Sequence, residues 1–214
     1  DNETRKYLLE SLYFMLASSF KNVSKPDVSN ILKIMSNLIA EYDCQLSDVK
    51  PIFIETSKLF QTFTEKGLRL AAVSIILSIA AKFPEFNYIS TLVADLNSYS
   101  TKRMHEYDFP RILSAYEQFC EKDYVSLTDM QWLPVLHTCL FYIRDEEELA
   151  LRTNATHCLT KFIDFSNAKT SESDAHSCVK YLKMIVLPSM RDGLRKTSED
   201  IQAEYITLLA YIVK

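Results

Sequence analysis

Histidine and cysteine residues lie close together at three places in the second half of the chain, which raises the question of a metal site. The three pairs are His137 with Cys139, His157 with Cys158, and His176 with Cys178. A zinc site needs four ligands that converge on one point, whereas side chains one or two positions apart on a helix point in different directions. Each pair could supply at most one ligand, so we expect no metal site. The odd number of cysteines, five, indicates free thiols buried in a core.

The sequence patterns of common hydrolases are missing from the chain. Neither G-x-S-x-G nor H-E-x-x-H occurs, and the 214 residues contain only two glycines, Gly67 and Gly193. So few glycines also argue against Gly-rich phosphate loops and dinucleotide-binding turns, which need a positive φ or a close backbone approach. We therefore predict that the protein is not an enzyme and has no catalytic residue, cofactor or small-molecule substrate.

Two groups of basic residues could contact a nucleic acid. In the first group, between residues 99 and 111, the aromatic residues Tyr99, Tyr107 and Phe109 alternate with cations. The second group lies between residues 180 and 196 and also includes Arg191, Arg195 and Lys196. Cations neutralise phosphates, and aromatic rings stack on bases. Six residues are candidate RNA contacts: Lys102, Arg103, His105, Arg111, Lys180 and Lys183.

An ordinary solvated surface is the alternative for both basic groups, and we favour it. Glu106 and Asp108 lie within the first group and Asp192 within the second, so the local charge is diluted. The formal net charge of −4 gives no general attraction for nucleic acid. A membrane partner is not expected either, because the longest apolar run, 70–81, has 12 residues and a spanning helix needs about 20.

One short run is strongly acidic and could bind a basic peptide of a partner protein. It consists of Asp145, Glu146, Glu147 and Glu148. These carboxylates also precede a predicted helix, where the positive end of the helix dipole favours negative charge. We favour this second interpretation, in which the run connects two helices.

The segment from Gln131 to Ser166 predicts two antiparallel helices joined by this acidic turn. Apolar residues recur in both halves at the spacing of one helical face. They are Trp132, Leu136, Cys139, Leu140 and Ile143, followed by Leu151, Ala155, Cys158, Leu159 and Phe162. A single hairpin of this kind would expose a large apolar surface, so it must stack on other hairpins.

Similar patterns run through the whole chain and predict one segment, 1–214, of about ten helices in five hairpins. The helix 67–83 is apolar on nearly all sides, so we place it in the interior. Ser47 is the expected N-cap of the third helix, with Pro51 in its first turn. The connector 99–108 has no clear period, and 166–174 reads as a polar loop. Pro188 should kink or break the helix that begins near Ala175.

Three hairpins share a degraded repeat. Leu133-Pro134 and Leu187-Pro188 are 54 residues apart, and a third partial copy begins at Pro51. The second helices carry an aliphatic-Arg pair and then Ala: Leu68-Arg69 with Ala72, and Leu151-Arg152 with Ala155. This pattern resembles HEAT repeats, which implies an all-α solenoid of irregular helical hairpins in a right-handed superhelical stack. The last helix ends mid-pattern without a polar outer face, so we expect a section of a longer array.

The stretches 133–155 and 187–206 resemble the down-regulated-in-metastasis proteins, very large HEAT-repeat components of the small-subunit processome. The resemblance is clearest over residues 131–214. It implies a nuclear and nucleolar scaffold in pre-ribosomal RNA processing and 18S rRNA maturation. Its partners would be other protein subunits of a large ribonucleoprotein assembly and pre-ribosomal RNA. The alternative is a HEAT-type nuclear transport or adaptor protein that binds peptides in its concave face.

Overall fold

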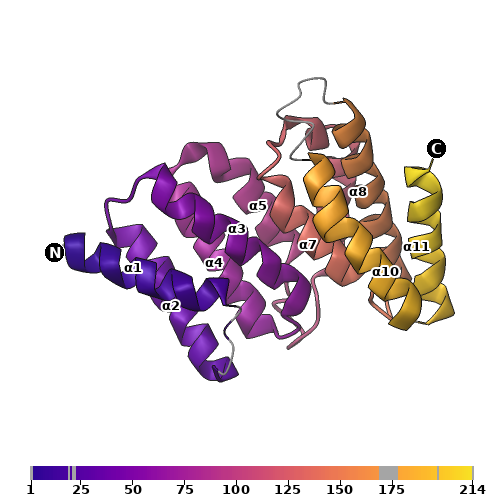
Figure 1. Ribbon diagram of the computed structural model, residues 1–214. Coiled ribbons are helices and arrows are strands. Elements are labelled where there is room, and N and C mark those ends of the chain that lie inside the picture. The colour runs from indigo at the N-terminus through magenta and orange to yellow at the C-terminus, as the bar shows by residue number, and fades with distance from the viewer. Residues whose placement is uncertain (1, 19, 21–22, 169–177, 197, 214) are drawn as a thin grey trace. The chain divides into compact units, whose positions relative to one another are not determined.

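The computed structural model describes residues 2–18, 20, 23–168, 178–196 and 198–213, and Figure 1 shows their helices in chain order. Every regular element among these residues is a helix, and one isolated β-bridge joins Tyr99 to Tyr107. The predicted all-α class is therefore confirmed. No described helix is both long and apolar enough to span a membrane. The chain divides into two compact units, Asp1–Asp108 and Phe109–Lys214.

The first unit is built from stacked helical hairpins. Its helices are α1 (Asn2–Ala17), α2 (Lys25–Glu41), α3 (Leu46–Thr62), α4 (Lys66–Lys82), a 3₁₀ turn (Pro84–Phe86) and α5 (Asn87–Leu96). α1 packs on both α2 and α3, and α4 packs on α2, α3 and α5. The first helices of the two hairpins thus lie together, as do the second helices. This is the packing that a stack of helical repeats requires.

α4 is the interior helix of the first unit, as predicted. Nine of its side chains are buried, including the arginine: Leu68, Arg69, Ala71, Ala72, Val73, Ile75, Ile76, Ile79 and Ala80. A helix can be buried in this way because three other helices cover it. Leu70 and Leu77 remain exposed, so one narrow stripe of the helix still faces solvent.

The second unit follows the same plan around α8. Its elements are α6 (Phe109–Glu121), a 3₁₀ turn (Asp123–Ser126), α7 (Trp132–Tyr142), α8 (Leu149–Ala168), a π-helical turn (Leu182–Val186), α10 (Leu187–Lys196) and α11 (Glu199–Ile212). α8 packs on α6, α7 and α11. All ten residues predicted to form the buried faces of α7 and α8 are buried. The ring of Trp132 lies at their centre, 5.2 Å from both Phe119 and Phe162.

Two helix boundaries differ from the prediction. α3 begins at Leu46 with Gln45 as its N-cap, because Asp48 accepts the N–H of Gln45 at 2.9 Å; Ser47 and Pro51 therefore lie inside the helix. α8 continues to Ala168. The remainder of the predicted loop 166–174 lies outside the described residues, as does His176.

Pro188 does not break its helix. The chain is helical from 178 to 196, and a π-turn over Leu182–Val186 ends two residues before the proline. The Leu187 N–H bonds to the Leu182 carbonyl across this wider turn. A proline ring collides with the carbonyl four residues earlier in a regular α-helix, so the wider turn gives Pro188 the room it needs.

The prediction of one continuous segment of five hairpins stays a prediction. The third of the five hairpins would pair the last helix of the first unit with the first helix of the second. Within each unit, the described helices form the stacked hairpins that the repeat pattern predicts.

Candidate nucleic-acid interface

The aperiodic connector predicted at 99–108 is a closed loop with a defined backbone. The Ser100 N–H bonds to the Glu106 carbonyl at 2.9 Å, and the Asp108 N–H bonds to the Ser98 carbonyl at 3.1 Å. At the tip, the Ser100 hydroxyl accepts the N–H groups of Lys102 and Arg103 at 3.2 and 3.0 Å. The loop therefore holds its cationic tip in place through its own hydrogen bonds.

A pair of tyrosines closes the base of this loop. The ring centroids of Tyr99 and Tyr107 are 4.9 Å apart and the rings are tilted by 33°. The Lys66 ammonium lies 5.2 Å from the centroid of Tyr99, within the range of a cation–π contact. Burial raises the pKa of the Tyr99 phenol well above its usual value, and the neighbouring Tyr107 adds to this effect. The phenol therefore stays neutral.

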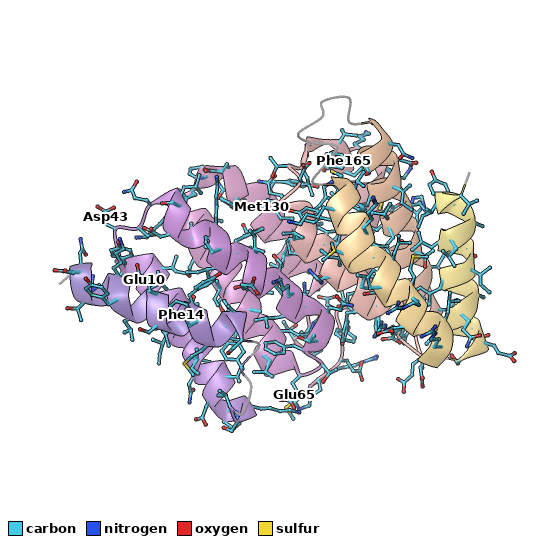
Figure 2. The ribbon with its side chains drawn as sticks, viewed as in Figure 1. Glu10, Phe14, Asp43, Glu65, Met130 and Phe165 are labelled. Carbon is cyan, nitrogen blue, oxygen red and sulfur yellow. The ribbon has the colours of Figure 1, made fainter. Side chains whose placement is uncertain are left out.

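The loop and the start of α4 enclose a groove of about 670 Å³. We call it the tyrosine groove and define it by the residues Lys66, Gly67, Leu70, Tyr99, His105 and Tyr107. Glu65, labelled in Figure 2, lies at its edge in the turn between α3 and α4. Sequence reasoning identified the loop residues but missed Lys66, because nothing in the sequence relates it to Tyr99.

A fully buried arginine fixes the elements that form the groove. Arg69 donates to the carbonyls of Phe60 and Phe63, at 2.8 Å each, and to the side-chain oxygen of Asn97. Asn97 in turn donates to the Val93 carbonyl at 2.8 Å. Arg69 therefore joins the end of α3 and the end of α5 to α4, which places the loop beside the first turn of α4.

Lys102, Arg103 and His105 are exposed on the loop, as a binding role requires. The Arg103 guanidinium forms an ion pair with Glu106 at 3.1 Å, which offsets part of its charge. His105 has a φ of 71°, a backbone conformation that side chains with a Cβ adopt infrequently. The loop thus brings three of the six predicted contacts together.

The other three predicted RNA contacts belong to the second unit. Arg111 is exposed on α6. Lys180 and Lys183 are exposed on the helical stretch 178–196, and their spacing of three residues places them on one face. They form a separate candidate surface.

The acidic turn acts as a helix connector. One Asp145 carboxylate oxygen accepts the N–H groups of Glu147 and Glu148, at 3.1 and 2.8 Å, just before α8 begins. Arg152 donates to the Asp145 carbonyl at 2.7 Å, so the turn is held to its own helix. Glu146 and Glu147 are exposed, and they are the part of the turn that a basic peptide could reach.

Three buried thiols of the second unit form a cluster that spacing alone did not predict. Cys120, Cys139 and Cys158 come from α6, α7 and α8, and the Tyr116 hydroxyl lies 3.6 Å from the Cys139 sulfur. Burial raises the pKa of Cys158, whereas the hydrogen bond from Cys158 lowers the pKa of Cys120. All five cysteines are free and buried, as predicted. Among the described residues, no three His, Cys, Asp or Glu side chains are arranged to hold a metal ion.

Comparison with known proteins assigns the chain to a family. Residues 1–198 match the family described as U3 small nucleolar RNA-associated protein 20, N-terminal. The Saccharomyces cerevisiae protein named U3 small nucleolar RNA-associated protein 20 is 44% identical over all 214 residues. The Schizosaccharomyces pombe protein of the same name is 37% identical over 127 residues, 59% of this chain.

The chain is much shorter than these relatives. It spans 9% of the Saccharomyces cerevisiae protein, and the match to the Schizosaccharomyces pombe protein covers 5% of that protein. Neither relative has the name of an enzyme. The match extends over both structural units, and it includes the tyrosine groove. The chain therefore belongs to the family of the N-terminal part of the U3 small nucleolar RNA-associated protein 20.

Proposed function

We propose that the chain is a non-enzymatic scaffold segment of a small-subunit processome protein, which acts in pre-ribosomal RNA processing and 18S rRNA maturation. The observation that carries this proposal is the 44% identity across the whole chain to a protein named for its association with a small nucleolar RNA. Stacked helical hairpins support it, because such stacks present long surfaces to several partners at once.

The same relatives support a proposal for the partners of the chain. We propose that they are other protein subunits of a ribonucleoprotein assembly, together with pre-ribosomal RNA, in the nucleus and nucleolus. Lys180, Lys183 and Arg111 are proposed RNA contacts, and Glu146 and Glu147 are proposed contacts for a basic segment of a protein subunit. The resemblance to the down-regulated-in-metastasis proteins points to the same kind of assembly.

Purification of the full-length parent protein tests the proposal. A tagged parent should enrich U3 small nucleolar RNA and pre-ribosomal RNA above a purification from untagged cells. Deletion of residues 1–214 should reduce this enrichment and cause 18S precursors to accumulate, which Northern blotting measures. Recovery of import cargo without either RNA would contradict the proposal and favour a transport or adaptor protein.

A further inference from the structure

We propose that the tyrosine groove binds single-stranded RNA, with a base stacked against the Tyr99–Tyr107 pair and phosphates held by Lys66 in the groove and by Lys102 on the adjoining loop. That the ligand is RNA rests on the proposed function; that a ligand binds at this place rests on the structure alone. The groove encloses about 670 Å³, within the range of about 300–1,000 Å³ typical of ligand sites. It is therefore large enough to hold a nucleotide.

The aromatic part of the groove is already arranged for stacking. Tyr99 and Tyr107 are both half-buried and bridged through their backbones, and their rings lie 4.9 Å apart. Arg69 holds the loop base through Asn97, so the ring pair stands on a rigid support. A preformed aromatic surface binds with little loss of side-chain entropy. The neutral Tyr99 phenol adds no negative charge that would oppose a phosphate.

The charges around the groove favour an anion. Glu65 forms an ion pair with Lys25 at 2.6 Å, and Glu106 forms one with Arg103 at 3.1 Å. In the part of the chain that the structure describes, Lys66 and Lys102 form no ion pair with a carboxylate. Glu65 at the groove and Glu106 on the loop are thus each paired with a cation, whereas Lys66 at the groove and Lys102 on the loop are not paired with a carboxylate, and this difference favours an anion.

Single-stranded RNA would use both the cations and the aromatic rings of this groove, whereas an acidic peptide would use only the cations. Carboxylates of a peptide could pair with Lys66 and Lys102 but would make no use of the tyrosine rings. A single-stranded RNA places a phosphate and a base in each nucleotide, which matches cations beside aromatic rings. Both tyrosines line the groove, so a base that enters the groove reaches them.

Fluorescence anisotropy with a labelled 12-residue oligouridylate tests the site on the 214-residue chain. Tyr107→Leu should weaken binding about tenfold, the loss expected for one base–aromatic stack, and Tyr107→Phe should bind like the unchanged chain. Lys66→Gln should weaken binding and should lower the slope of log K against log salt by about 0.7, the value for one phosphate contact to a single strand. Circular dichroism melting confirms that each variant is folded.

Matched substitutions outside the groove serve as controls. Lys33→Gln removes the same charge from α2, and Phe14→Leu removes an aromatic ring that is 72% exposed on α1 (Figure 2). Both controls should leave the affinity unchanged. Affinity losses in the controls as large as those of Lys66→Gln and Tyr107→Leu would overturn the proposal, because binding would then not depend on the groove.

Ultraviolet cross-linking gives a second readout that needs no substitution. After cross-linking to the oligouridylate and digestion with trypsin, the adduct should appear on peptide 104–111, which contains Tyr107, or on 83–102, which contains Tyr99. Adducts confined to other peptides would place the RNA elsewhere and overturn the proposal. Displacement of the RNA from the groove by equimolar polyglutamate would also overturn it, in favour of an acidic peptide.

The two proposals can fail separately. If the tagged parent enriches U3 small nucleolar RNA but the groove variants bind oligouridylate normally, the groove proposal is wrong and the scaffold function stands. If the parent enriches no U3 RNA while Tyr107→Leu weakens oligouridylate binding as expected, the groove binds RNA and the proposed function is wrong.

Discussion

At the residue scale, the two buried arginines of the repeat should differ in how much they stabilise the fold. Arg69 donates to three buried or partly buried oxygens, whereas Arg152 donates to the Asp145 carbonyl. Arg69→Met would leave these oxygens without the arginine, at about 1–3 kcal/mol for each buried group. We expect it to lower the free energy of unfolding by about 3 kcal/mol, measured by urea denaturation.

Arg152→Met is the matched comparison, because it removes an arginine from the same position of another hairpin. We expect a loss of about 1 kcal/mol for the single carbonyl. Equal losses in the two variants would mean that the number of carbonyl contacts does not determine the contribution of this arginine. The repeat pattern could identify both arginines from the sequence. It could not identify Asn97 as a partner, because 28 residues of chain separate it from Arg69.

At the scale of the element, Gly193 shows why a helical glycine can be required. A Cβ at this position of α10 would overlap the Tyr205 ring on α11; it would lie 2.7 Å from Cδ2 and closer still to two other ring carbons. Tyr205 is fully buried and its hydroxyl accepts a hydrogen bond from Arg144 at 3.1 Å, so the ring cannot move freely. Gly193→Ala should therefore destabilise the protein by about 1–3 kcal/mol, measured by chemical denaturation.

Gly67→Ala provides the control with the opposite expected sign. No heavy atom of a neighbouring residue lies within 4 Å of a Cβ at Gly67, in the first turn of α4. Replacing it should stabilise the protein by about 0.4–1 kcal/mol, because alanine reduces the entropy of the unfolded chain. If Gly193→Ala were stabilising as well, the close approach of α10 to α11 would be wrong.

The helices themselves could be predicted because their signal is local. Apolar residues three and four apart identify a buried face wherever they occur, and this is why the buried faces of α7 and α8 were correct residue by residue. Local sequence patterns did not predict the features that depend on packing between elements. The π-turn before Pro188 and the closed loop at 98–108 arise from backbone hydrogen bonds that no periodicity encodes.

At the scale of the whole molecule, residues that are distant in sequence produce the features that local patterns could not predict. Lys66 meets Tyr99, and the three clustered thiols come from three helices. Each contact depends on how one helix packs on another, and the sequence specifies the apolar faces without specifying which polar groups they bring together. The cations on the loop of the candidate site were thus predicted from the sequence, whereas Lys66 and the start of α4 were identified as part of the site only from the fold.

Stability at alkaline pH should depend on both units, because tyrosines of both units have a pKa that is raised by burial. Burial raises the pKa values of Tyr99, Tyr116 and Tyr205 above the usual value. In the unfolded chain such phenols ionise at about pH 10, whereas in the folded protein they are still protonated at that pH. The free energy of unfolding should therefore be unaffected by these groups below about pH 10 and should fall as the pH rises above it.

Urea denaturation at a series of pH values between about 8 and 11, a window around the pKa of an ordinary tyrosine, tests this expectation. Tyr116→Phe should make the alkaline decline shallower, because one buried phenol no longer titrates. The neighbouring Cys158 thiol has a raised pKa for the same reason, so part of the decline should persist in that variant. Tyr7→Phe, at an exposed position, should leave the decline unchanged. A decline as steep in Tyr116→Phe as in Tyr7→Phe would show that ionisation of Tyr116 is not linked to unfolding.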